Sequence, residues 1–248
     1  MGRWIATAIL ACIALPCAAQ RTYAIVSLVG DQIEIGQHVP GVGSSVDQNR
    51  KSRLPIANGA IDKAFLGAAD RAIEKTQAGS RSVMLLATDP ALYQAQERMI
   101  EENASVDVLF ERLRPLLAQA NATHLVLFTK LRHEARFPLG NYEVGSGTIE
   151  GTGFYVDRIL MTRVGGTSND TARGFLAPYA YFQVTLVDLS ASTIVKSRTV
   201  LGRANYSAAR GESGEAWDAL TDAEKVNVLM RIARREAYDA TVEVIAAP

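Results

Sequence analysis

The sequence has almost no cysteine and no excess of charge of either sign. Cys12 and Cys17 are the two cysteines among 248 residues, and both lie near the amino terminus. If residues 1–19 are removed, the remaining chain can form no disulfide and has no thiol chemistry. Lysine and arginine number 26, as do aspartate and glutamate. Bulk charge therefore gives no reason to expect binding to nucleic acid or to an anionic membrane.

Histidine is also scarce, and its spacing does not favour a metal site. The three histidines are His38, His124 and His133, and none has a second histidine three or four residues away, as a compact zinc site would require. His133 and Glu134 could contribute to a site only with partners from distant segments. The Gly-x-Ser-x-Gly motif of many hydrolases does not occur. We therefore expect no metal and no cofactor and name no catalytic residue, although the sequence leaves enzymatic activity open.

Residues 1–19 have the pattern of a secretory signal peptide. Arg3 supplies a positive charge, residues 4–15 form an apolar run, and small residues follow before Gln20. This run is too short for a membrane span, which takes about 20 residues. We expect cleavage between Ala19 and Gln20, with no membrane span in the processed chain.

Lipid attachment stays open as an alternative form of processing. The residues before Cys12 match a lipoprotein signal in part, and those before Cys17 match it poorly. Either route would take the protein out of the cytoplasm. Because the composition is rich in arginine and alanine, as in many bacterial proteins, we expect a periplasmic or secreted protein.

Strand and helix patterns alternate in residues 20–248 and predict a single α/β domain. The expected strands are Thr22–Val29, Gln32–His38, Ser82–Ala87, Thr123–Leu131, Phe154–Thr162, Ala180–Leu189 and Thr193–Leu201. Helices should begin near Asn58, Asp89 and Ser105, and Pro115 should kink or restart the third. A capping box, Thr221 to Glu224, should begin a long last helix. We predict one mixed sheet with flanking helices and a long carboxy-terminal helix.

Side-chain alternation assigns faces in the last hairpin and in the last helix. Val184 and Leu186 should be buried, whereas Thr185 should lie on the other face. Tyr179 and Tyr181 share that other face, where they should pack in a core or at an edge; the alternative is a half-exposed aromatic patch that binds a partner. The buried stripe expected on the last helix consists of Val226, Met230, Ala233, Ala237 and Val244.

Three glycine-containing segments are expected to be loops. Pro40–Pro55 contains the basic residues Arg50, Lys51 and Arg53, and the polar segments Gly165–Gly174 and Gly202–Gly214 flank the last hairpin in sequence. Antiparallel pairing should bring the latter two to the same end of that hairpin. Polar segments of this kind are often solvated, mobile loops; the alternative is a partner-binding surface, since long loops in compact domains often carry function. Its predicted residues are Arg173 and Arg210, which supply charge, and Phe175, which supplies an apolar anchor.

The glycine-rich segment from Gly145 to Gly153 invites comparison with a phosphate-binding loop. Such a loop needs a helix amino terminus after it, whereas this segment leads into an expected strand and lacks Gly-Lys-Ser/Thr. We therefore expect a hairpin or a bulge there.

The runs ATHLVLFTKLR and YFQVTLVDLSASTIVKSRTV, followed by the long last helix, carry a family resemblance. They resemble the envelope α/β domain of the curli-secretion-channel family, and they are similar to the amino-terminal domain of TolB in the Tol-Pal system. Asp188 before the hairpin turn and the first strand, Tyr23–Val29, fit the same pattern. The turn itself, Ser190–Ser192, lacks the usual glycine, and no cysteine is properly placed for the curli family's lipid attachment. The resemblance implies an envelope assembly or partner-binding domain without catalysis.

Two functions follow as hypotheses. The first is a periplasmic, non-catalytic interaction or assembly module of the bacterial cell envelope with an envelope protein as its partner. It predicts exposed aromatic side chains or an open sheet edge, without a deep polar pocket. The alternative is a soluble periplasmic hydrolase or small-ligand-binding protein. It predicts a cleft where His133, Glu134 or another titratable group meets distant partners. The sequence does not define the oligomeric state.

Overall fold

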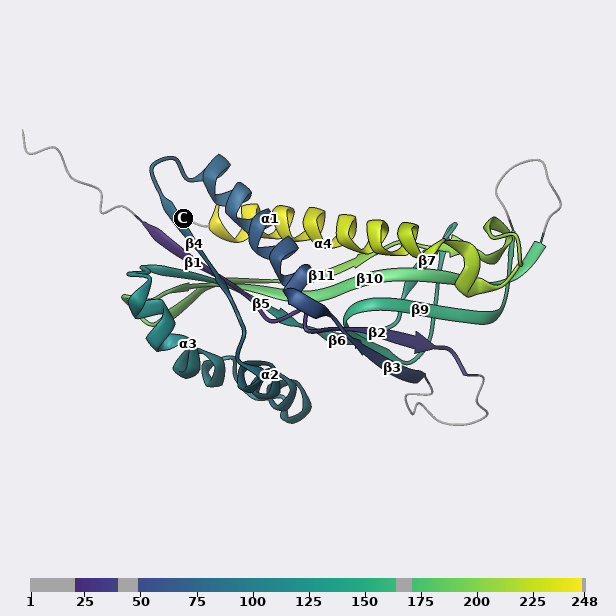
Figure 1. Cartoon of the computed structure of the whole chain (residues 1–248), viewed down its shortest axis with the longest axis horizontal. Helices are drawn as coiled ribbons and strands as arrows, with labels where there is room; N and C mark the ends of the chain where they lie inside the picture. The colour runs from purple at the N-terminus through teal and green to yellow at the C-terminus, as the bar shows by residue number, and fades with distance from the viewer. Residues whose placement is uncertain (1–20, 40–48, 164–170, 247–248) are drawn as a thin grey trace, which may run out of the picture.

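The computed structural model describes residues 21–39, 49–163 and 171–246 (Figure 1). The helices are α1 (Ala60–Thr76), α2 (Pro90–Glu102), α3 (Asp107–Gln119) and α4 (Asp222–Ile245). The strands are β1 (Thr22–Ser27), β2 (Gln32–Gln37), β3 (Arg50–Pro55), β4 (Arg81–Leu86), β5 (His124–Lys130), β6 (Arg132–Glu134), β7 (Phe137–Leu139), β8 (Tyr142–Val144), β9 (Thr148–Arg163), β10 (Thr171–Asp188), β11 (Thr193–Arg203) and β12 (Tyr206–Ser207).

Ten of these strands form one mixed sheet, and β7 and β8 form a separate hairpin. The main order is β3-β2-β9-β10-β5-β1-β4. Strand β10 holds the sheet together, because residues 171–181 pair with β9 and residues 182–188 pair with β5, while β11 lies on its other side. Strand β1 runs parallel to both β4 and β5. The predicted α/β class, the mixed sheet and the long last helix are thus confirmed.

Helices cover both faces of the sheet in its β10-β5-β1-β4 part. Figure 1 shows α1 and α4 above the sheet and α2 and α3 below it. Alternation along β5 explains this: Val126 and Phe128 point into the core beneath α1 and α4, and Leu125 and Leu127 point into the core formed with α2 and α3. A third core, which includes Tyr155, lies at the β7–β9 end of the molecule. No described helix is both long and apolar enough to cross a membrane.

Several sequence expectations about loops and strands are wrong. The carboxyl-terminal part of Pro40–Pro55 is strand β3, residues 171–174 begin β10, and Gly202–Gly214 contains the end of β11 and all of β12. In the third expected helix, α3, Pro115 lies inside a continuous helix that ends at Gln119, so the helix does not restart at the proline. Strand β4 is not buried, because it lies at the edge of the sheet and its exposure alternates.

The predicted separation of the two faces of the hairpin is confirmed, and the structure shows that both faces are covered. Val184 and Leu186 are buried as expected, but Thr185, Tyr179 and Tyr181 are buried as well. Thr185 has Ser197 as a hydrogen-bonding neighbour, and the two tyrosines pack in the third core. In α4, the prediction is wrong for one residue of the stripe, since Val226 is 61% exposed.

Candidate interaction surface

Three edge strands of the sheet differ in how well they are protected against pairing. Strand β3 carries basic residues at 50, 51 and 53 and ends in Pro55. Strand β11 carries basic residues at 196, 198 and 203 and lies beside a register shift at Leu186/Val187. Charge, proline and irregular register each discourage the addition of another strand. Strand β4 has Arg81 at its start and no other charge, proline or register shift, so β4 is the least protected of the three.

The free side of β4 presents both backbone groups and apolar side chains. The Arg81 N–H donates to the Arg21 carbonyl. Because backbone groups alternate in direction along a strand, those of residues 82, 84 and 86 point away from β1. In the part of the chain that the structure describes, β4 pairs with β1 alone. Met84 is 53% exposed and Leu86 is 37% exposed. A strand could therefore pair with β4 and cover both side chains.

A crevice of about 370 Å³ continues this edge at the carboxyl ends of β1 and β4. Ligands of open α/β sheets commonly bind at such strand ends. Its lining residues come from the segments that follow the two strands, from the connection between β3 and α1, and from α2: Asp31, Ile56, Gly59, Ala87, Thr88, Pro90, Tyr93, Gln94 and Glu97. The carboxylates and the phenol are suited to hydrogen bonds with a polar or cationic group of a bound chain.

A buried carboxylate fixes the wall of the crevice. Asp62, in the first turn of α1, is fully buried. Its Oδ1 accepts from the Ser27 hydroxyl (2.5 Å) and from the backbone N–H groups of Val29 (3.1 Å) and Gly30 (2.9 Å). Tyr93 donates to Oδ2. Burial raises the pKa of Asp62, and these donors offset part of the rise. Asp62 thus ties α1 and α2 to the end of β1.

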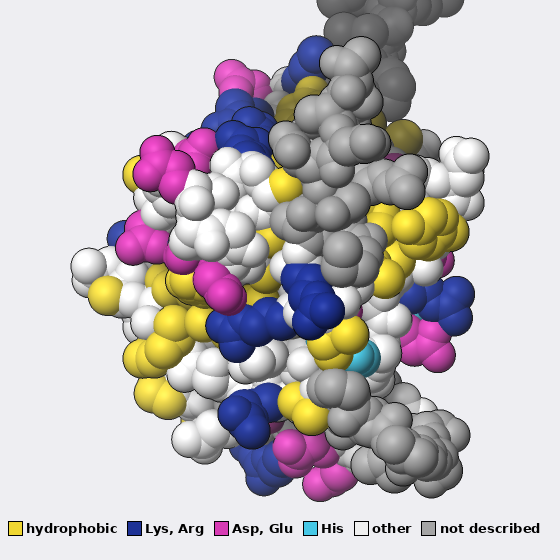
Figure 2. Space-filling view, turned by 90° about the vertical axis from the view of Figure 1, so that its right-hand side faces the viewer, with side chains coloured by type: hydrophobic (Ala, Val, Ile, Leu, Met, Phe, Trp, Pro, Cys, Tyr) yellow, Lys and Arg dark blue, Asp and Glu magenta, His cyan; other side chains and the backbone are white. Residues whose placement is uncertain are grey.

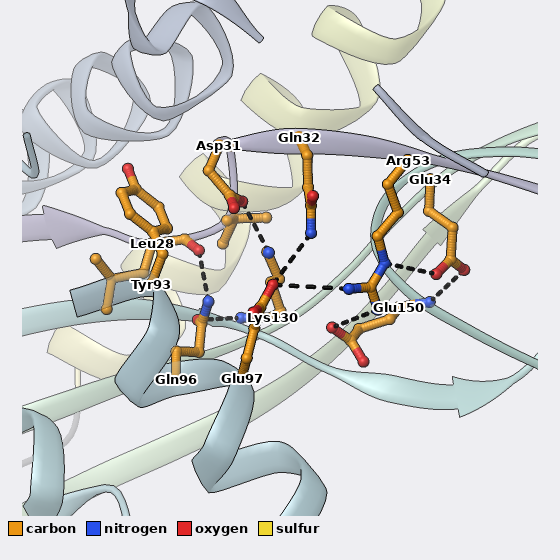
Figure 3. Close-up of polar contacts among 12 residues, drawn as sticks. Leu28, Asp31, Gln32, Glu34, Arg53, Tyr93, Gln96, Glu97, Lys130 and Glu150 are labelled. Carbon is orange, nitrogen blue, oxygen red and sulfur yellow. Dashed lines mark hydrogen bonds and ion pairs between the residues drawn. The ribbon is translucent and has the colours of Figure 1, made fainter. Parts of the chain in front are cut away.

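A buried amide side chain joins α2 to the end of β1 and to β5 (Figure 3). Gln96 Nε2 donates to the Leu28 carbonyl and Gln96 Oε1 accepts from the Lys130 N–H, each at 2.8 Å. The side chain of Lys130 is almost fully buried and lies 2.7 Å from Asp31 Oδ1. Since a buried ammonium needs a counter-charge, Asp31 is held at this position beside the crevice.

Figure 3 also shows Arg53, which is surrounded by three carboxylates. Its guanidinium lies 3.8 Å from Glu34, 3.7 Å from Glu97 and 4.0 Å from Glu150. Glu34 is buried and also accepts from the Glu150 N–H (3.2 Å) and the Tyr179 hydroxyl (3.3 Å). Burial raises the pKa of Glu34, whereas Lys51, the Glu150 N–H and Arg53 lower it in part. The basic residue at 53, expected in a solvated loop, therefore links β3 to β2, β9 and α2.

The three predicted partner-binding residues lie near one another, but one cannot bind as expected. Phe175 pairs with Ser207 across β10 and β12, so the beginning of β10 lies beside part of the Gly202–Gly214 segment; residues 164–170 of the other segment lie outside the described residues. Arg173 and Arg210 are exposed, and Arg210 contacts Glu224 and the ring of Tyr206. Phe175 is fully buried, so its assignment as an apolar anchor is wrong. A binding role for the two arginines stays a prediction.

The end of the molecule that carries these arginines has no broad surface of one charge where its side chains are visible. Figure 2 views this end and shows basic and acidic side chains interspersed, apart from the area covered by grey atoms. The predicted cleavage site, Ala19 and Gln20, lies outside the described residues, as do Cys12 and Cys17.

The histidines lie outside the crevice described above. His133 and Glu134 lie on β6, and no group of three His, Cys, Asp or Glu residues in the described ranges could hold a metal ion. His38 Nδ1 lies within hydrogen-bonding reach of the Ser146 hydroxyl, but within those same ranges no carboxylate hydrogen-bonds His38. The glycine-rich segment continues into β9 rather than into a helix, so it does not form a phosphate-binding loop.

Comparison with known proteins gives fold-level likenesses alone. No family model matches the chain, and no curated protein matches it. A solved structure described as a neuraminyllactose-binding hemagglutinin homologue from Helicobacter pylori has a TM-score of 0.39 at 7% identity and covers 92% of this chain and 84% of its own. A DUF330 protein from Xanthomonas campestris has a TM-score of 0.33 at 10% identity, with coverages of 91% and 81%. A hypothetical protein from Chlamydia trachomatis has a TM-score of 0.31 at 10% identity, and the match covers 91% of this chain and 99% of that protein. At these scores the likenesses carry no argument about function.

Sequence reasoning missed Met84 and Leu86 as surface residues. The run SVMLLA is apolar after Ser82 and favoured a strand covered on both faces. A strand at a sheet edge can have the same sequence, because strand order is determined by distant pairings.

Proposed function

We propose that this chain is an exported, non-catalytic interaction or assembly module of the bacterial envelope that binds an extended protein segment along β4. The observation that carries the proposal is the contrast among the edges: β3 and β11 carry several charges, and β4 carries one. Backbone pairing at a free edge is a common mode of peptide recognition, in which main-chain hydrogen bonds give affinity and exposed side chains give specificity.

The crevice supports the same function. It lies where β4 ends, so a segment paired with β4 would extend past Thr88 toward Asp31 and Glu97. The edge and the crevice together offer a continuous surface for one chain. The signal-like residues 1–19 support export to the periplasm, and mass spectrometry of the processed protein should find a chain that starts at Gln20.

Introduction of a charge on β4 tests the docking surface. Met84→Lys should prevent strand addition, because an edge lysine must be desolvated by an incoming strand. Leu54→Lys on β3 is the matched control, since Leu54 is 47% exposed. A photo-reactive side chain at residue 82 should cross-link an envelope partner in cells, and Met84→Lys should abolish that product while Leu54→Lys preserves it. Equal cross-linking in both variants would rule out β4 as the docking edge.

A further inference from the structure

Strand β4 and the three residues after it form a sequence that is complementary to itself. From Arg81 to Asp89 it reads RSVMLLATD. If two copies run antiparallel with Leu85 at the centre, the opposing pairs are Arg81 with Asp89, Ser82 with Thr88, Val83 with Ala87, and Met84 with Leu86. Each pair joins opposite charges, two hydroxyls or two apolar side chains. Cross-strand pairs of these kinds stabilise antiparallel sheets.

The backbone directions agree with this register. In an antiparallel ladder, hydrogen-bonded and non-hydrogen-bonded pairs alternate. The backbone groups of Leu85 point toward β1, so Leu85 suits a central non-hydrogen-bonded pair. Those of Met84 and Leu86 point away from β1, so each can exchange two hydrogen bonds with the residue opposite it. Asp89 is also in an extended conformation, which lets the pairing continue to the end of the segment.

The side chains at both ends of the segment are available for the pairing. Arg81 and Asp89 are exposed, and in the described ranges neither makes an ion pair. Asp89 accepts from the Ala91 N–H with Oδ1. Between these charges, Met84 and Leu86 share the α1 face of the strand with Ser82, whose hydroxyl bonds Asp70 of α1. The register thus brings exposed apolar groups together at the centre and opposite charges at both ends.

We infer that the first partner of β4 is a second copy of this chain, paired antiparallel across a two-fold axis at Leu85. The inference rests on the proposed function of β4 as a docking edge and names its occupant. The two sheets would form one continuous sheet, with the charged residues at 81 and 89 specifying the register. Such an interface is isologous, so each contact occurs twice.

Cysteine scanning tests the axis directly, because the predicted processed chain has no cysteine of its own. Facing Cα atoms in a non-hydrogen-bonded pair are about 4.5 Å apart, within the range for a disulfide. Leu85→Cys should therefore give a disulfide-linked dimer on mild oxidation. Met84→Cys and Leu86→Cys should cross-link slowly when alone and readily when mixed, since these positions face each other. Leu54→Cys on β3 is the control and should stay monomeric.

Charge reversal provides a second test that does not depend on disulfides. Arg81→Asp and Asp89→Arg should each lose the dimer in sedimentation, because each places like charges at both ends of the interface. Mixing the two variants should restore a dimer of one copy of each, since every end pair is again opposite in charge. Circular dichroism must show that both variants are folded. Asp89 caps α2, so Asp89→Arg could unfold the protein. In that case the mixture of Met84→Cys and Leu86→Cys replaces the charge-reversal test.

The outcomes separate this inference from the proposed function. A wild-type protein that sediments at one chain mass over the full concentration range, together with no preference for cross-linking at residue 85, would overturn the second copy as partner. The proposed function would then be decided separately by the photo-cross-linking experiment: a cross-linked product at residue 82 that is lost in Met84→Lys would support it, and no such loss would contradict it. The stated axis would also be overturned if the Met84→Cys variant, unmixed, formed disulfide-linked dimers fast and the Leu85→Cys variant did not.

Discussion

The hydroxyl of Tyr93 donates a hydrogen bond of 2.7 Å to Oδ2 of Asp62, and so joins α2 to α1 across the crevice. Asp62 also receives the hydroxyl of Ser27 and the N–H groups of Val29 and Gly30 through its other oxygen. The crevice wall therefore depends on one buried carboxylate with four donors.

Removing that carboxylate should cost far more than removing one donor. In Asp62→Ala, buried donors are left without a partner, and each costs about 1–3 kcal/mol, so we expect a loss of about 3 kcal/mol or more in the free energy of unfolding. Tyr93→Phe removes a single hydrogen bond and should cost about 1 kcal/mol. Urea denaturation of both variants measures the difference. Similar losses in the two would show that the backbone donors find other partners.

Glu34 should make stability depend on pH. Its pKa is raised above the ordinary value of 4.5 for a glutamate because the carboxyl group is buried. The native state then holds this proton more tightly than the unfolded chain, so the contribution is present below the ordinary pKa and is lost as pH rises through the raised pKa. Glu34→Gln should show a smaller loss of stability between pH about 4 and about 7.

Urea midpoints measured across that pH range provide the test. Glu111→Gln is the matched control, because Glu111 is exposed on α3. Wild-type and Glu34→Gln curves that stay parallel over the whole range would contradict the assignment of a raised pKa to Glu34.

The sequence predicted the elements whose signals are local. Alternation in 180–189 and the capping box at Thr221 found the hairpin and α4, because both signals depend on residues next to one another. Strand β3 was missed because its basic sequence resembles a solvated loop. Its Arg53 is stabilised by Glu34 and Glu150, which lie on strands distant in sequence.

The candidate surface could not be predicted for the same reason. Whether β4 is an edge depends on the strand order, which is set by pairings of β1 with β4 and β5. The burial of Thr185 and Phe175 likewise depends on elements that pack on the second face. Local alternation shows that two faces differ but does not show that both are covered.

Gly153 should not tolerate a side chain. It lies opposite Glu34 in the β2–β9 register, and a Cβ there would lie 1.8 Å from the Glu34 carbonyl oxygen. Gly153→Ala must therefore separate β2 from β9 and should cost about 3 kcal/mol or more. Gly67→Ala is the control, because its Cβ would meet only the Arg71 guanidinium, at 3.8 Å. It should gain about 0.5–1 kcal/mol as a helical alanine. Thermal melts of the two variants should move in opposite directions.

The central hairpin should be sensitive to charge on both faces. Leu186 is 3% exposed beneath α1 and α4, and Thr185 is 2% exposed on the opposite face. An aspartate at either position would place an unpaired charge in a closed core, so each variant should lose about 4 kcal/mol or more or fail to fold. Thr199→Asp on β11 is the control, because Thr199 is exposed, and it should change stability by about 0.5 kcal/mol or less.

Chemical denaturation of the three hairpin variants decides whether both faces are covered. If Thr185→Asp unfolds at nearly the wild-type midpoint while Leu186→Asp does not fold, solvent reaches the α2–α3 face of β10. The helices would then leave room beside Ser197, whose hydroxyl lies 3.1 Å from that of Thr185. Severe destabilisation by both changes requires instead that the α2–α3 layer stays closed over β10 in solution, because a charge in contact with water would cost little.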